Sequence, residues 1–286
     1  MTATANLEDD SDPSGSKNKS GQVLQRRSSG AHLGESPEQQ KSGDSGMPEF
    51  DIYPDWLRVG PWSPLATIFI VGFGIWLLWS ASDAVATLPM EAAGNVADST
   101  VARVSRLLMA VYCTFITARS IRSFGWWPLM SYTMVAYTLL AFRLLASAIG
   151  LHFSAEALRF PVLVMAWVTT TVWWLVLVPL ILVLMPGGRE ARRGFVKFNF
   201  SPFLINVHLL NLPIAMLDHR TAYRPLRFWD LWVSLLVAFA YMLFYLNIMD
   251  RNGIHFYIIL SPRPWWCVIV YAAVVGVYVF IYGAFG

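Results

Sequence analysis

The residues with the strongest chemical character inside an apolar stretch lie between residues 201 and 218. His208, Asn211 and Asp218 are separated there mainly by Leu, Ile, Pro and Met. At ~100° per residue, these three side chains fall within a stripe of roughly 80° on one side of a helix. Hydrocarbon makes an unpaired polar group costly, so we expect the stripe to face other protein or a wet cavity. An ionisable residue at membrane depth indicates a functional site; the alternative is that His208 and the asparagines, Asn206 among them, join helices by hydrogen bonds.

A buried histidine can do chemistry when a hydroxyl lies beside it, because its imidazole takes the hydroxyl proton near neutral pH. Ser131 and Thr133 are the candidate hydroxyls, since they stand at the start of a predicted helix, where free N–H groups favour developing negative charge. Hydroxyls in membrane helices mostly bond their own backbone, so a structural role is the alternative for each. The two positions differ by about 200° around a helix, so only one of them is expected to face His208.

Other kinds of site have no sequence signature here. The chain has no Gly-rich phosphate loop, no HExxH, no GxSxG and no CxxC pair. Cys113 and Cys267 lie far apart in apolar segments and give neither a disulfide framework nor metal-ligand spacing. We therefore expect no metal and no other cofactor. The formal net charge of +3 is small and dispersed, which does not indicate a nucleic-acid partner.

The elements that position these residues are predicted to be membrane helices. Of the 286 residues, 56% are hydrophobic and 14% are charged, whereas soluble domains average ~25% charged residues. The apolar runs predict an all-α, polytopic membrane bundle of about seven transmembrane helices. The apolar run over 101–121 is the weakest of these, and the sequence leaves open whether it is a full span. The predicted spans are residues 64–86, 101–121, 129–149, 159–185, 201–218, 228–248 and 264–285.

The remaining stretches are predicted to be loops and a tail. Residues 1–62 are rich in Ser, Gly and charged residues, which predicts a disordered, cytosolic tail before a transmembrane domain over 63–286. His152 and Glu156 are expected in a short loop, and residues 189–197 in a basic loop. Arg143 lies near the end of its span, where it either snorkels to the interface or pairs with Asp218 or Asp83.

Several short motifs resemble one known family. They are His208-Leu209-Leu210-Asn211 ending at Asp218, Tyr223-Arg224-Pro225, Asn252 to Tyr257, Phe160-Pro161 with Trp173-Trp174, and Gly125 to Tyr132. Together they resemble the androgen-induced protein family, multi-pass membrane proteins that hydrolyse fatty acid esters of hydroxy fatty acids, with Rolling-stone-like proteins as relatives. The resemblance covers residues 101–286. It implies a membrane lipid as substrate and the bilayer as surroundings.

The resemblance also implies roles for individual residues. His208 takes the part of the base, and Ser131 holds the nucleophile position by its spacing from Trp127, although Thr133 follows two residues later. The family's final motif has Trp-x-Tyr-Pro, whereas this chain has His255-Phe256-Tyr257-Ile258, which leaves the choice of substrate open.

The sequence thus predicts an intramembrane hydrolase of fatty acid esters in the endoplasmic reticulum or the plasma membrane. The alternative is a non-enzymatic multi-pass transporter or scaffold. If the chain is an enzyme, Ser131 or Thr133 must come within hydrogen-bond reach of His208, about 2.6–3.2 Å, or be joined to it by one water. We expect Ser131 in that role. We also expect a pocket between the third and fifth spans, lined by Trp and Phe and open toward lipid, with Asn211 and Asp218 orienting the imidazole or bonding other buried donors.

Overall fold

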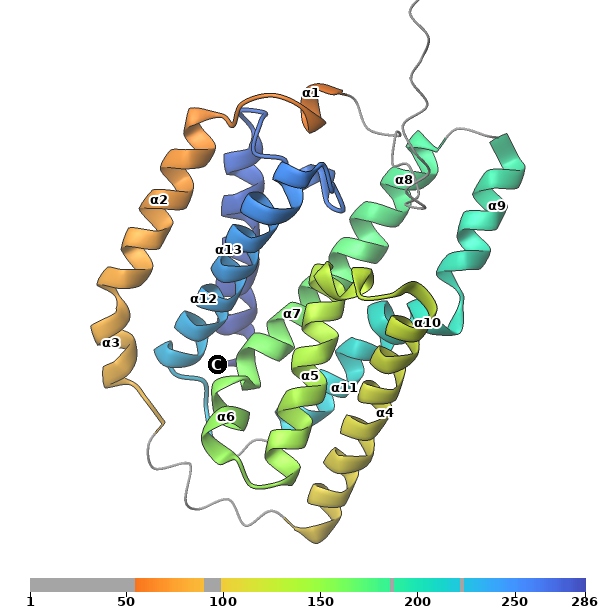
Figure 1. Cartoon of the computed structure of the whole chain (residues 1–286). Coiled ribbons are helices and arrows are strands. Elements are labelled where there is room, and N and C mark those ends of the chain that lie inside the picture. The colour runs from red at the N-terminus through yellow and green to blue at the C-terminus, as the bar shows by residue number, and fades with distance from the viewer. Residues whose placement is uncertain (1–54, 90–98, 186–187, 222–223) are drawn as a thin grey trace, which may run out of the picture. The chain divides into compact units, whose positions relative to one another are not determined.

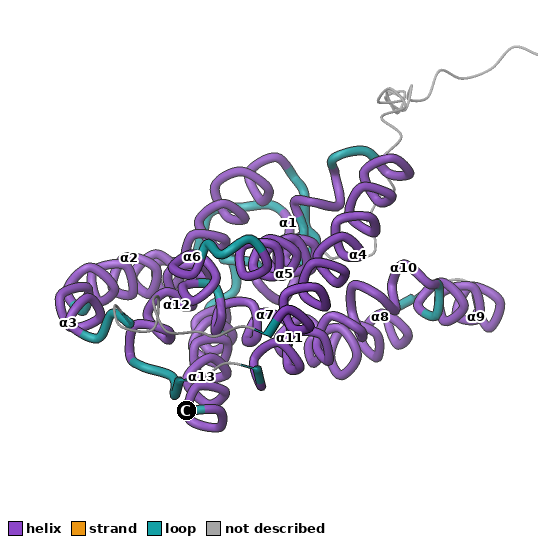
Figure 2. Tube along the Cα trace, turned by 90° about the horizontal axis from the view of Figure 1, so that it is seen from below, coloured by secondary structure: helices purple, strands orange, loops and turns teal. Residues whose placement is uncertain are grey.

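All regular structure in the described part of the chain is helical. The computed structural model describes residues 55–89, 99–185, 188–221 and 224–286, and these contain no strand (Figure 1; Figure 2). Most of the tail predicted over residues 1–62 lies outside the described residues. Its end is described: α1 (Asp55–Arg58) buries Leu57, whose carbonyl accepts a hydrogen bond from Ser261 at 2.7 Å. The packed part of the chain therefore begins before the predicted boundary at residue 62.

The helices follow the apolar runs of the sequence. They are α2 (Pro64–Trp79), α3 (Ala81–Ala86), α4 (Thr100–Phe124), α5 (Tyr132–Ala148), α6 (His152–Ala157), α7 (Arg159–Thr171), α8 (Val178–Leu184), α9 (Gly188–Asn199), α10 (Pro202–Ile205), α11 (Asn211–Arg220), α12 (Phe228–Phe244) and α13 (Cys267–Phe285). Short 3₁₀ turns lie at η1 (Trp127–Met130), η5 (Asp250–Asn252) and η6 (Ile258–Leu260).

Four continuous helices in the described residues are long and apolar enough to cross a membrane. They cover Thr100–Phe124, His152–Leu184, Phe228–Asn252 and Cys267–Phe285. A fifth span results if Gly188–Asn199 and Pro202–Arg220, which meet at a bend of 55°, are counted as one. The shorter apolar helices α2 and α5 occupy the other two predicted positions. The protein is thus an integral membrane helical bundle, and the weak run over 101–121 is a full-length helix.

Two predicted loops are helical instead. His152 and Glu156 lie in α6, which belongs to the long helix His152–Leu184. The basic loop predicted over 189–197 is α9, in which cations alternate with apolar residues at helical spacing. Such an amphipathic pattern is stable as a helix where an apolar face meets lipid or protein and a charged face meets water. The sequence prediction considered the charge of this segment and missed its periodicity.

Helix α5 lies at the centre of the packing that positions the candidate site. It contacts α4, α6, α7 and α11, and Figure 1 and Figure 2 show it between these neighbours. Ten of its 17 residues are buried. At ~1.5 Å per residue its length is about 25 Å, short of the ~30 Å hydrocarbon core. A helix this short is accommodated because protein, rather than lipid, covers most of its surface.

Candidate functional site

His208 lies on a widened turn of its helix. The turn is the π-helical segment η3 (Asn206–Leu210), which joins α10 to α11. The imidazole is 5% exposed and stacks on the indole of Trp173, with ring centroids 3.9 Å apart and planes 14° apart. Trp173 lies on a second π-helical turn, η2 (Val172–Leu177). π-helical turns are rare and occur often at functional sites, so the contact between these two turns marks His208 and Trp173 as a candidate site.

Both π turns are held by further hydrogen bonds. Trp174 donates from Nε1 to the carbonyl oxygen of His208 at 3.3 Å. Trp173 donates from Nε1 to Oδ1 of the buried Asn199 at 3.0 Å. In the stacked pair, the Trp173 indole is therefore held in place by a hydrogen bond. The imidazole Nδ1 is buried and has no hydrogen-bond partner among the residues that the structure describes.

Ser131, the hydroxyl expected to act as nucleophile, is engaged in starting α5. Its backbone is extended (φ −75°, ψ 145°), and its Oγ accepts a hydrogen bond from the Met134 amide at 3.3 Å. The same oxygen donates to the carbonyl of Pro128 at 2.8 Å. A serine in this conformation satisfies one of the free N–H groups of the first helical turn. The structure therefore gives Ser131 a clear structural role.

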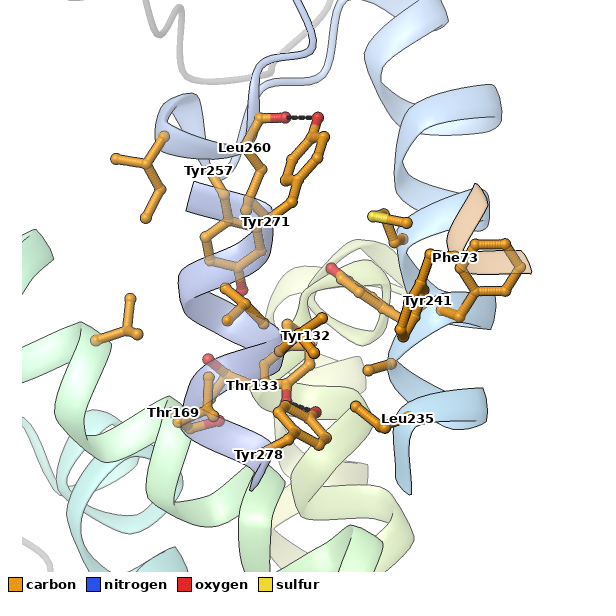
Figure 3. A pocket seen from close by; sticks show the side chains of 18 of the residues that line it. Phe73, Tyr132, Thr133, Thr169, Leu235, Tyr241, Tyr257, Leu260, Tyr271 and Tyr278 are labelled. Atoms are coloured by element: carbon orange, nitrogen blue, oxygen red, sulfur yellow. Dashed lines mark hydrogen bonds between the residues drawn. The ribbon is translucent and has the colours of Figure 1, made fainter. Parts of the chain in front are cut away.

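Thr133, the second residue of α5, faces a cavity of about 120 Å³ that is partly open to the outside (Figure 3). The cavity is bounded by α2, α5, α7, η2, α12, α13 and the segment around η6. Its wall is mostly aromatic and aliphatic, and its polar atoms belong to Thr133, Thr169 and tyrosines. The tyrosines are Tyr132, Tyr241, Tyr257, Tyr271 and Tyr278. Of the two hydroxyls predicted, Thr133 is the one that lines an internal space.

Tyrosine hydroxyls organise this cavity. Tyr132 and Tyr278 share a hydrogen bond of 2.6 Å, and Tyr271 donates to the carbonyl of Leu260 at 2.9 Å (Figure 3). Burial raises the pKa of the Tyr257 phenol, and hydrogen bonding to the Thr133 and Ser131 side chains opposes part of this rise. Tyr257 is therefore a neutral phenol beside Thr133 that is able to donate a proton in a hydrogen bond.

The cavity lies elsewhere than predicted. We expected it between the third and fifth spans, but none of its lining residues comes from α10, η3 or α11. Helices α5 and α11 contact each other directly, and buried residues such as Leu140 and Ala215 belong to the same core cluster. The space opens instead on the other side of α5, where large aromatic side chains of α2, α12 and α13 converge. The expected aromatic lining is present, with Phe69, Phe73 and Trp173 in the wall.

His208 does not line the cavity; Trp173 borders the cavity and stacks on the imidazole. No hydrogen bond joins His208 to Ser131 or Thr133 in the described structure. Trp173 is thus the link between the predicted base and the cavity. The sequence prediction used the Trp173-Trp174 pair only as a family motif.

The two asparagines near His208 have different surroundings. Asn206 donates from Nδ2 to the Pro202 carbonyl at 2.7 Å and accepts a hydrogen bond from Tyr112 on α4. It therefore joins two helices, as the structural alternative predicted. Asn211 is fully buried, and neither atom of its amide has a hydrogen-bond partner among the described residues. The expected contact between Asn211 and the imidazole is not formed.

Asp218 pairs with arginines rather than with the histidine. Arg143 donates from Nε to Asp218 Oδ2 at 2.5 Å, and Arg106 Nε lies 3.3 Å from Oδ1. Arg143 also donates to the Ala155 carbonyl and is 3% exposed, so it pairs with Asp218 and does not snorkel. Asp218 follows His208 by ten residues, about 15 Å along a helix at ~1.5 Å per residue. The two side chains share a side of the helix but lie at different depths.

A second charged cluster lies at the start of α12. Arg224 donates from Nη1 and Nη2 to the two oxygens of Asp230, at 2.7 and 2.9 Å, and from Nε to Glu156 at 2.8 Å. Asp230 also accepts from the Arg227 amide at 2.7 Å, which caps α12. Arg159 donates to the Arg224 carbonyl at 2.7 Å. The sequence prediction placed Glu156 in a loop and placed Arg159 and Asp230 at the starts of two spans, and it did not foresee that these residues meet.

Ligands for a metal ion are not assembled in the described residues, where no group of three His, Cys, Asp or Glu side chains lies close together. The nearest approach to such a group is His255 with Asp250, whose Nδ1 and Oδ1 atoms lie 3.2 Å apart. Arg263 Nη1 also contacts this Oδ1, at 2.7 Å. This set connects η5 to the segment before α13.

Comparisons with protein-family models, with curated proteins and with solved structures find no match for this chain. The resemblance to the androgen-induced protein family therefore stays a prediction from short motifs. Function must be argued from the site itself.

Proposed function

We propose that this membrane protein hydrolyses fatty acid esters within the bilayer, with Thr133 as the nucleophile. The observation that carries the proposal is the position of the Thr133 hydroxyl on the wall of an apolar internal cavity, next to the Tyr257 phenol. A cavity holds one water at about 10–15 Å³ on the same measure. The 120 Å³ of this cavity is therefore enough for several groups of about the size of a water molecule, which suits part of an acyl chain.

The surroundings of Thr133 fit acyl transfer. The Thr133 Oγ1 atom would form a bond to the ester carbonyl carbon while the alcohol leaves, and water would then release the fatty acid from the acyl-threonine. The protonated phenol of Tyr257 is suited to donate a hydrogen bond to the carbonyl oxygen as negative charge develops on it. A threonine hydroxyl reacts slowly without a base that accepts its proton.

His208 supplies the base in this proposal. Its Nδ1 atom is free of partners among the described residues, and its ring stacks on a tryptophan of the cavity wall. To reach Thr133 the imidazole must leave this stack, so the structure corresponds to a resting arrangement. Catalytic hydrogen bonds are often long in the absence of substrate and form only in the complex.

The test uses the full chain in detergent micelles or vesicles with fatty acid esters of hydroxy fatty acids as substrates. We expect hydrolysis by the native protein and a loss of about 100-fold to 10,000-fold in Thr133→Ala and in His208→Phe. Phe keeps a ring that stacks on Trp173, so its effect is not attributable to a hole in the core. Thr117→Val is the matched control and should keep the rate, because the Thr117 hydroxyl bonds the Cys113 carbonyl within α4 and does not line the cavity. An unchanged rate in Thr133→Ala would exclude the proposal.

The second candidate is a non-enzymatic transporter or scaffold that binds an apolar molecule in the same cavity. The absence of His208 from the lining of the cavity favours it. A fluorophosphonate probe separates the two functions, because it labels an activated hydroxyl in an enzyme and leaves a binding protein unlabelled. Labelling that disappears in Thr133→Ala would support the hydrolase. The proposed location, the endoplasmic reticulum or the plasma membrane, is tested by imaging the tagged full chain against markers of both.

A further inference from the structure

The side chain of Tyr241 lies between two hollows. One is the internal cavity that Thr133 lines; the other is a groove of about 530 Å³ between α12 and the segment formed by η1 and the start of α5. Among the residues that the structure describes, Tyr241 is the one that borders both hollows. The groove and the cavity are therefore separated at this position by a single ring.

Tyr241 is held in place by contacts that a rotation of its side chain would break. Its hydroxyl donates to the carbonyl of Met130 at 3.0 Å. Its ring packs edge-on against Tyr132, with centroids 5.2 Å apart and planes 73° apart. Figure 3 shows Tyr241 and Tyr132 at the cavity with Phe73 nearby. Its ring also contacts those of Phe244 and Tyr245 on α12 and its continuation.

The outer groove is apolar and belongs to the membrane-facing surface. It is lined by residues such as Leu129, Val135 and Phe244. Ala240, on its floor, is exposed, and Trp126 at its rim is 71% exposed. Tryptophan favours the level of the lipid headgroups, and the rest of the lining is almost entirely apolar. An acyl chain of a bilayer lipid fits these surroundings in polarity.

We propose that this groove is the lateral entrance through which one acyl chain of a membrane lipid passes Tyr241 into the internal cavity. The inference rests on the proposed function for the fate of the chain at Thr133, but entry by this route is a binding event that needs no hydrolysis. Tyr241 acts as the gate: closed, its hydroxyl bonds Met130; open, its ring has moved aside and the two hollows are continuous.

The experiment follows entry with a long-chain alkyl ether that carries a diazirine, which has the chain of the substrate but cannot be hydrolysed. The full chain is reconstituted in phosphatidylcholine vesicles, irradiated and digested, and labelling is located residue by residue at Val274 and Tyr278 of α13, which line the inner cavity. Labelling at Phe280, which is exposed on the same helix and does not line the cavity, measures contact with bulk lipid. Ala240→Trp fills the groove. Leu236→Trp is the matched control, because Leu236 is also exposed on α12 but lines neither hollow.

We expect Ala240→Trp to lower labelling at Val274 and Tyr278 by about tenfold. If the new indole keeps about two methylene groups of the probe from being buried in the groove, the affinity for the probe falls by about this factor. Leu236→Trp should leave labelling unchanged. Tyr241→Phe, which lacks the hydrogen bond to Met130, should speed it. All three variants are first checked for native size and helix content. Equal inner labelling in Ala240→Trp and Leu236→Trp would overturn the entrance.

The outcomes also separate this inference from the hydrolase. Thr133→Ala should be labelled as strongly as the native protein while losing hydrolysis. If labelling depends on the groove but no ester is hydrolysed, the entrance stands and the enzyme fails. If esters are hydrolysed normally by Ala240→Trp, the enzyme stands and the entrance fails.

Discussion

Asn in place of Asp218 is expected to destabilise the protein strongly without touching the proposed chemistry. The carboxylate contacts Arg143 at 2.5 Å and Arg106 at 3.3 Å, and the side chains of Asp218 and Arg143 are each 3% exposed. Removing one partner of a buried ion pair leaves charge that nothing compensates, which costs about 3–5 kcal/mol, against 0–1 kcal/mol for an exposed pair. Because two arginines depend on Asp218, we expect the upper part of this range.

The assay is reversible unfolding in mixed micelles with increasing denaturing detergent, read as the free energy of unfolding. Arg143→Met in the Asp218→Asn background supplies the second measurement. Met fills most of the volume and removes the guanidinium that pairs most closely with Asp218, so we expect the double variant to recover a large part of the loss. Arg106 keeps its hydrogen bond to Thr221, at 2.9 Å, in both.

A loss below about 1 kcal/mol in Asp218→Asn would refute the reasoning, because the pair would then behave like one at an exposed surface. A double variant no more stable than the single one would refute the claim that Arg143 is the main unpaired charge. Labelling of the inner cavity should be unaffected in the folded variants, since no residue of α11, which carries Asp218, lines that cavity.

Three further changes are expected to alter stability in the same assay. Ser131→Ala should cost about 1 kcal/mol through loss of the cap on α5, with hydrolysis retained. Arg224→Lys should cost about 2 kcal/mol, because an ammonium cannot replace the bidentate contact with Asp230; full stability would show that this contact contributes nothing. Gly253→Ala should cost about 1 kcal/mol, since this residue has φ +75°, whereas Gly72→Ala, at an open helical position, should be neutral or stabilising.

The membrane class and the approximate places of the helices followed from the sequence alone. Hydrocarbon requires each crossing segment to be apolar and to satisfy its own backbone, so a run of apolar residues predicts a helix whatever its neighbours are. A pairing of Arg143 with Asp218 was one of the alternatives, because two opposite charges in apolar segments need partners.

The site depended on contacts that the sequence does not encode locally. His208, Asn211 and Asp218 are all buried, as expected for a polar stripe in an apolar helix, yet such a stripe does not say which residue meets which neighbour at each depth. The π turns that bring His208 against Trp173 arise where two helices adjust to each other, and neither has a sequence signature.

The sequence by itself indicated two candidate hydroxyls at the start of one helix, Ser131 and Thr133, and the expectation that only one would face a given neighbour assumed that both are helical. Ser131 is an extended cap instead, and both side chains lie beside Tyr257. Tertiary structure decided which one lines the cavity. Ser131 is held by the first turn of α5, and the rotation of that buried helix against α4, α7 and α11 turns Thr133 toward the aromatic side chains of α12 and α13. Packing between helices far apart in the chain sets this rotation, and no local pattern of residues reports it.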